Sequence, residues 1–193
     1  TKEAYWLQFG RLKKHPLQSK YLVRLDYTKA RKGIYVPESV EKPQIQDMLH
    51  CDMETRTENK KEFLSNSSEI TLHGGLTQSS DKARSGQYSV KTGVEQNYAL
   101  SHSIKVAKGD KYEISVWRDN TAPEHAGLVI ACPDPKMFFH KENEPIAKDG
   151  KWEQLGYVIT ISQDYPDSIM HIFVMNTTGK DAYFDDYSLK KIE

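Results

Sequence analysis

Two adjacent carboxylates, Asp185 and Asp186, interrupt the last stretch of the chain that has the pattern of a strand, residues 182–192 (AYFDDYSLKKI). Side chains alternate between the two faces of a strand, so one acid falls on each face. Such a pair loses solvation unless a bound cation or a ring of hydrogen-bond donors compensates it. A second acidic stretch, residues 51–54 (CDME), ends in Glu54. These acids are therefore candidates for a cation site or a ring of donors.

The histidines and remaining acids show no pattern typical of catalysis. A hydrolytic site needs two carboxylates that face each other, and a nucleophile needs a base with an orienting partner. The seven histidines fall in no metal or nucleophile signature. The nearest approach to a zinc cluster is His140, Glu142 and Glu144. The sequence therefore predicts that the protein is not an enzyme.

The two cysteines, Cys51 and Cys132, are too far apart in sequence for a CxxC redox pair or a metal motif. Two buried thiols and one disulfide both remain compatible with the sequence.

The 193 residues carry a formal net charge of zero, but the charge is uneven. Residues 1–50 hold 10 Lys and Arg against 5 Asp and Glu, whereas residues 51–193 hold 17 against 22. The larger, mildly acidic part argues against nucleic acid as a partner, because phosphates require a basic surface. No apolar run of about 18 residues is present, so no membrane-spanning segment is predicted.

The elements that must position these residues are short strands separated by turn signals such as Gly74-Gly75 and Asp149-Gly150. Short strands at this spacing, without a convincing helix, predict a β-sandwich or jelly roll of two antiparallel sheets. The predicted strands are 48–54, 68–73, 87–93, 97–106, 111–118, 126–132, 152–161, 169–175 and 182–192.

Residues 1–47 are expected to form a separate N-terminal segment before a sandwich domain at 48–193. Aromatic and apolar residues recur at roughly helical spacing within residues 1–20, next to a basic cluster. This pattern allows either a membrane-proximal segment or a short amphipathic element that packs on the neighbouring domain. Residues 21–36 alternate as a hairpin does, and residues 37–47 have the composition of a linker.

Several motifs follow one another in a recognisable order. They are CDME (51–54), ARSGQYSV (83–90), KYEISVW (111–117), GKWEQL (150–155), YVITIS (157–162) and AYFDDYSL (182–189). This succession, over roughly residues 48–193, resembles the jelly-roll carbohydrate-binding modules of the xylan- and glucan-binding type, which are usually appended to secreted glycoside hydrolases.

The resemblance implies a structural calcium ion. Its ligands by position are Glu54, the turn at residues 85–88 that begins with Ser85, and Asp185. The chemistry agrees, since calcium prefers several carboxylate and carbonyl oxygens. Solvated acids, or acids paired with nearby Lys or Arg, are the alternative.

The resemblance also implies a glycan-binding face formed by Trp117, Phe138 or Phe139, and His171. Alternation directs Ile114 and Val116 to one side of their strand and Trp117 to the other, and it likewise separates Ile172 and Val174 from His171. Aromatic rings receive the apolar faces of sugars, while hydroxyl groups need hydrogen-bond partners. Trp152 is expected in the core. Pro133–Ile146 is expected to be a loop, and it departs most from the family pattern.

Two functions remain open from the sequence. The first is non-catalytic binding of an oligo- or polysaccharide through an aromatic-lined concave sheet face braced by calcium. The second is a scaffold or protein-interaction domain of a larger cell-envelope protein, without a sugar site. The expected location is extracellular, periplasmic or at the cell surface, and the protein is expected to be monomeric.

Overall fold

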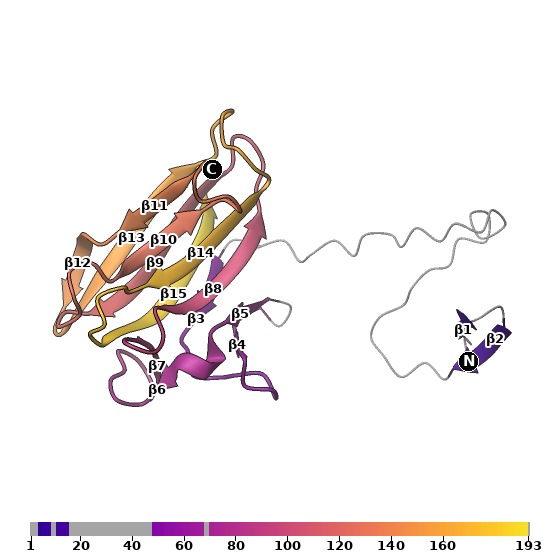
Figure 1. Ribbon diagram of the computed structural model, residues 1–193, viewed down its shortest axis with the longest axis horizontal. Helices are drawn as coiled ribbons and strands as arrows, with labels where there is room; N and C mark the ends of the chain where they lie inside the picture. Colours follow the sequence, from indigo (N-terminus) through magenta and orange to yellow (C-terminus); the bar gives the residue numbers. More distant parts are fainter. Residues whose placement is uncertain (1–3, 9–10, 16–47, 68–69, 193) are drawn as a thin grey trace. The chain divides into compact units, whose positions relative to one another are not determined.

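A computed structural model describes residues 4–8, 11–15, 48–67 and 70–192 of the chain (Figure 1). The chain divides into two compact units, Thr1–Lys42 and Pro43–Glu193. Within the described residues, no helix is long and apolar enough to cross a membrane.

The first unit contains a small antiparallel hairpin. Strand β1 (Ala4–Gln8) pairs with β2 (Arg11–His15) in a register that sets Ala4 opposite His15. The helical spacing expected within residues 1–20 is therefore wrong at residues 4–8 and 11–15, which form two short strands. The predicted hairpin at 21–36 and the predicted linker lie outside the described residues.

The second unit is a sandwich of two antiparallel sheets, which confirms the predicted fold class (Figure 1). The six-stranded sheet has the order β11 (Phe139–Glu142), β10 (Gly127–Ala131), β14 (Ile169–Met175), β8 (Tyr98–Lys105), β5 (Thr71–His73) and β4 (Glu62–Leu64). The seven-stranded sheet has the order β12 (Pro145–Asp149), β13 (Trp152–Thr160), β9 (Lys111–Asp119), β15 (Ala182–Ile192), β7 (Ser89–Thr92) and β6 (Gln78–Ser79), and β3 (Met48–Cys51) also pairs with β15. One short 3-10 helix, η1 (Gly75–Thr77), precedes β6.

Most predicted strands are present, and several are shorter than expected. The main difference lies at Pro133–Ile146, which was expected to be a loop. Strand β11 and the start of β12 form there, with Phe139 opposite Ala131 and Pro145 opposite Leu155. Charged side chains and an irregular register in β12 hide the alternation that marks a strand, because both elements lie at sheet edges.

The core lies between the sheets and follows the predicted alternation. Ile114 and Val116 from β9 and Ile172 and Val174 from β14 are all buried. Trp152 is also buried, with 9% of its surface exposed, as expected for a structural tryptophan.

Both cysteines are buried free thiols, so the disulfide alternative is wrong. Burial raises the pKa of the Cys51 thiol to about 12. The thiol of Cys132 donates a hydrogen bond to the carbonyl oxygen of Asp134 at 2.9 Å. These thiols therefore belong to the packed interior.

Candidate functional site

The buried carboxylate of Asp185 accepts three backbone hydrogen bonds. Its Oδ2 accepts from the N–H groups of Arg84 at 2.7 Å and Ser85 at 3.2 Å, and its Oδ1 accepts from the N–H of Asp186 at 2.8 Å. A β-bulge shifts the register of β15 between Asp185 and Ser188, and Asp186 has a φ of 49°. Because of this bulge both acids bond to residues 84 and 85, instead of lying on opposite faces as the sequence predicted.

Glu54 holds the other end of the same turn. Its Oε1 accepts hydrogen bonds from the N–H groups of Gln87 at 2.9 Å and Tyr88 at 2.8 Å. Gly86, which precedes Gln87 in this turn, has a φ of 58°, and a Cβ added there would lie 2.4 Å from Cδ of Glu54. The turn at residues 84–88 is therefore held by an acid from the start of the sandwich and an acid from its last strand.

This geometry is a test of the predicted calcium site at Glu54, Ser85 and Asp185. The oxygens of Asp185 face N–H donors, and the Ser85 side chain donates to Asp186 at 2.7 Å. Among the described residues, no group of three or more His, Cys, Asp or Glu side chains is arranged to hold a metal ion. The donors already compensate the acids, so the residues present do not require a cation. Calcium binding stays a prediction.

The pKa of Asp185 reflects two opposing effects. Burial raises the pKa to about 7, and the nearby charge of Asp186 adds to this, whereas the backbone N–H groups of Arg84 and Ser85 lower it. Desolvation is the larger effect, because the carboxylate is fully shielded from solvent.

Trp117 lies on the outer side of the seven-stranded sheet, next to this turn. The guanidinium carbon of Arg84 lies 3.8 Å from the centre of the Trp117 ring, in a cation–π contact. Ion pairs with Asp186 at 2.8 Å and Asp149 at 3.0 Å hold the guanidinium in place. One face of the ring is therefore already covered.

Trp117 and His171 do not share a face, and that prediction is wrong. Trp117 belongs to β9 of the seven-stranded sheet and His171 to β14 of the six-stranded sheet. In both strands the alternate residues point into the common core, so the two side chains lie on opposite outer sides of the sandwich.

Of the two phenylalanines predicted as alternatives for this face, Phe138 does not belong to it. Its ring packs against the core, 5.1 Å from the ring of Tyr165. Phe139, the next residue, points outward and is 46% exposed.

Phe139 and His171 do lie on the same side of the six-stranded sheet. The strand register places Phe139, Ala131, His171 and Ser103 in one row across β11, β10, β14 and β8. Residues directly opposite each other in an antiparallel sheet point to the same side, so this row forms part of one surface.

The next rows complete a surface that we call the aromatic face. Its outward residues are Phe139, Lys141, Val129, Ala131, Tyr98, Ser101, Ser103, His171, Phe173, Met175, His73 and Glu62. Tyr98 is 51% exposed, and its ring centre lies 5.8 Å from that of Phe173. The sequence reasoning overlooked Tyr98, although its place at the start of a predicted strand could have marked it.

Polar groups of the aromatic face are fixed by local hydrogen bonds. Ser103 Oγ lies 2.6 Å from Nδ1 of His171, which orients the imidazole ring, and no described residue bonds its Nε2. His73 Nδ1 lies 3.1 Å from an oxygen of Glu62. The stem of Lys141 lies against Gly127 on the same sheet, and burial lowers the pKa of the Lys141 amine. The face thus combines oriented polar groups with exposed aromatic rings.

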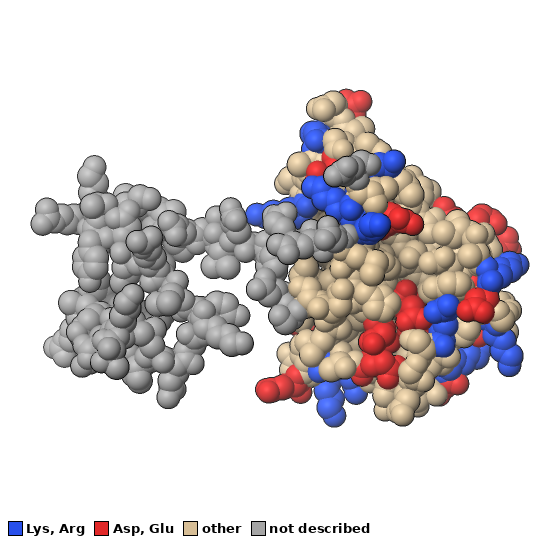
Figure 2. Space-filling model, turned by 180° about the vertical axis from the view of Figure 1, so that it is seen from behind, with Lys and Arg blue, Asp and Glu red and all other residues tan. Residues whose placement is uncertain are grey.

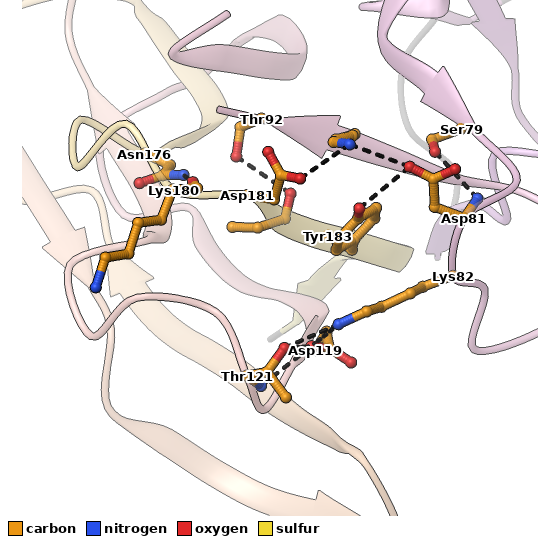
Figure 3. Close-up of polar contacts among 12 residues, drawn as sticks. Ser79, Asp81, Lys82, Thr92, Asp119, Thr121, Asn176, Lys180, Asp181 and Tyr183 are labelled. Carbon is orange, nitrogen blue, oxygen red and sulfur yellow. Dashed lines mark hydrogen bonds and ion pairs between the residues drawn. The ribbon is translucent and has the colours of Figure 1, made fainter. Parts of the chain in front are cut away.

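A separate polar cluster lies where β7 meets β15 (Figure 3). Lys91 bridges Asp181 at 2.9 Å and Asp81 at 3.1 Å, and the Tyr183 hydroxyl donates to Asp81 at 3.2 Å. The Lys82 amine lies 4.9 Å from the centre of the Tyr183 ring. Hydrogen bonds from Lys91 and Tyr183 lower the pKa of Asp81. These contacts give both Asp81 and Asp181 a partner, so we assign the cluster a structural role.

The surface charges are mixed in sign. Figure 2 shows both acidic and basic residues among uncharged surface on the face that it presents, with basic side chains gathered toward the top of the sandwich.

Comparison with known proteins finds similarity in fold but not in sequence. No protein-family profile and no curated protein sequence matches the chain. Similar solved structures include the CBM22-1 xylan-binding domain from Paenibacillus barcinonensis Xyn10C, with 16% identity, a TM-score of 0.48, and coverage of 78% of this chain and 98% of that one. The C-terminal family 22 carbohydrate binding module of Clostridium thermocellum Xyn10B has 14% identity, a TM-score of 0.46, and coverage of 74% and 92%. A cyclase from Fischerella sp. TAU has 12% identity, a TM-score of 0.42, and coverage of 76% and 86%.

Proposed function

We propose that the sandwich is a non-catalytic carbohydrate-binding domain and that the aromatic face binds an oligo- or polysaccharide. The observation that carries this proposal is the grouping of Tyr98, Phe139 and Phe173 on one outward sheet surface beside oriented polar groups. Rings of this kind accept the apolar C–H faces of sugars. The Nε2 of His171, which no described residue bonds, and the hydroxyl of Ser101 supply partners for sugar hydroxyls.

The proposal differs from the sequence prediction in its residues. Phe139 and His171 are retained, and Tyr98 and Phe173 take the place of Trp117 and Phe138. The rigid strands β14 and β8 fix these side chains relative to one another, which limits the entropy that is lost on binding. We expect the binding of uncharged polysaccharide chains to be enthalpically favourable, with weak to moderate affinity.

The experiment is isothermal titration calorimetry with xylohexaose and cellohexaose, supported by affinity electrophoresis in soluble polysaccharide. Tyr98→Ala and Phe139→Ala are each expected to weaken binding about tenfold or more, because a stacked ring contributes of the order of 1–2 kcal/mol. Leu76→Ala is the matched control, since Leu76 is 75% exposed but belongs to η1. Binding that is unaffected by both aromatic substitutions would refute the assignment of the face.

The scaffold function is the alternative outcome of the same experiment. If neither these oligosaccharides nor a wider polysaccharide panel binds, the domain is better explained as a protein-interaction module of a larger cell-envelope protein. We propose that the domain is monomeric and acts outside the cytoplasm, where polysaccharides are accessible, and that residues 1–20 lie close to a membrane.

Calcium bracing by Glu54, Ser85 and Asp185 is a separate part of the proposal. A metal that binds only the folded state raises the melting temperature, and a chelator lowers it again. An equal melting temperature with excess calcium and with chelator would show that the N–H donors alone stabilise the turn at residues 84–88.

A further inference from the structure

We infer that the opposite side of the sandwich carries a second carbohydrate site, in a trough that crosses β9, β15 and β3. The trough has a volume of about 610 Å³. Its lining residues include Ser115, Ser188, His50, Trp117 and Lys190. The site lies on the outer side of the seven-stranded sheet and shares no residue with the aromatic face.

Small side chains produce the floor of the trough. Ser115 of β9 lies directly opposite Ser188 of β15, and Ser188 lies opposite His50 of β3. With strands about 4.8 Å apart, this row extends over roughly 10 Å across the sheet. On the β13 side, Ile146 occupies the space above Gly156, where a Cβ would lie 2.3 Å from Cδ1 of Ile146. The floor is therefore elongated and is bounded at β13.

Larger side chains form the two walls. One wall consists of Gln154 and Trp117, which are paired in register, with Arg84 stacked on the tryptophan ring. The other wall consists of Glu113 and Lys190, which are also paired in register. Both walls rise above a serine floor, because the serine side chains are much shorter than their neighbours. The result is a channel lined with hydroxyl, amide, imidazole and charged groups.

The charge of the lining favours a neutral, hydroxyl-rich ligand. Asp52, Glu113 and Asp186 are opposed by Arg84 and Lys190. Asp186 is already paired with Arg84 at 2.8 Å, and Glu113 faces Lys190 in register. The lining therefore has one acid more than it has bases, which disfavours an anionic ligand and is too small a net charge to select a strongly cationic one. Sugar hydroxyls both donate and accept hydrogen bonds, so they match a lining that mixes donors and acceptors.

An extended peptide is a poorer fit for the trough. Recognition of a peptide by strand addition requires a free sheet edge. In the floor, β9 is paired with β13 and β15, and β15 is paired with β9 and β3. The backbone groups of these two strands are therefore used within the sheet. Strand β3 pairs with β15, and the N–H and carbonyl oxygen of His50 in β3 are also bonded to Asn66.

The test is a chemical-shift titration of the isotopically labelled full chain with xylohexaose and cellohexaose, combined with calorimetry. Wild-type protein is expected to bind two oligosaccharides, with one set of shifts at Ser115, Ser188 and the Trp117 indole and another at Tyr98 and Phe139. Ser115→Phe fills the trough. The affinity obtained from the trough shifts is expected to fall at least tenfold in this variant. Ser101→Phe is the matched variant, because Ser101 is an outward, half-buried serine on the aromatic face.

The outcomes separate this inference from the proposed function. Shifts confined to the aromatic face and abolished by Ser101→Phe would overturn the trough site and leave the proposed face intact. Shifts confined to the trough and abolished by Ser115→Phe would support the trough and refute the proposed face. No shifts in either region would refute both. If Ser115→Phe does not fold, the map of wild-type shifts and Gln154→Ala give the same decision.

Discussion

We predict that protonation of His102, in the interior of the sandwich, destabilises the fold at acidic pH. His102 lies between the sheets and is 6% exposed. Its Nε2 is 2.7 Å from the hydroxyl of Tyr187, and its Nδ1 is buried without a partner among the described residues. A protonated imidazole would place a positive charge there with no carboxylate bonded to it.

Burial lowers the pKa of His102 from 6.5 to about 4, with a smaller contribution from the charge of His73. The folded protein therefore binds this proton more weakly than the unfolded chain does. The stability that comes from the neutral ring is complete above the unfolded pKa of 6.5 and is lost as the pH falls toward about 4. Each pKa unit corresponds to about 1.4 kcal/mol, so roughly 2 kcal/mol should be lost by pH 5 and roughly 3 kcal/mol by pH 4.

The assay is urea unfolding, followed by tryptophan fluorescence at pH 7.5, 5 and 4, for wild type and His102→Phe. The substitution removes the titrating ring and keeps a large ring in the core. Between pH 7.5 and 4, the loss in the free energy of unfolding should therefore be about 3 kcal/mol smaller for the variant than for wild type. Comparing the two proteins cancels the contribution of Asp185, whose raised pKa acts with the opposite sign. His125→Phe, at an exposed histidine, is the control and should follow wild type. If wild type and His102→Phe lose equal stability over this range, the reasoning is refuted.

The remaining predictions concern the turn at residues 84–88. Gly86→Ala should lower the free energy of unfolding by about 3 kcal/mol, because the new Cβ would meet Glu54, whereas Gly150→Ala, with the same φ of 58° and nothing within 4 Å, should cost only about 1 kcal/mol. Equal costs in thermal unfolding would show that the contact with Glu54 is unimportant. Asp185→Asn should cost about 2–4 kcal/mol, since it turns an acceptor of three N–H groups into a side chain with one acceptor oxygen. The melting temperature should fall by roughly 5–15 °C, against little change for the surface substitution Asp134→Asn, and a fall below about 2 °C would contradict the assigned role.

Local information in the sequence was sufficient for the strands and for the orientation of many side chains. Alternation correctly directed Ile114 and Val116 into the core, and Gly and Pro marked most of the turns. It failed at β11 and β12, where edge strands with charged side chains lack a clear apolar period. It also failed for residues 4–8 and 11–15, where a few aromatic residues spaced three or four apart suggested a helix and two short strands are present instead.

The sequence by itself determined that the chain forms an antiparallel sandwich and that its closing acids need compensation. Only the tertiary structure decided how the acids are compensated and which aromatic residues share a surface. Alternation states which side of a strand a residue occupies, but not which of two sheets the strand joins. Because β9 and β14 join different sheets, Trp117 and His171 lie on opposite sides of the molecule. Tyr98 and Phe173 meet because strand pairing brings together residues that are 75 positions apart in the sequence.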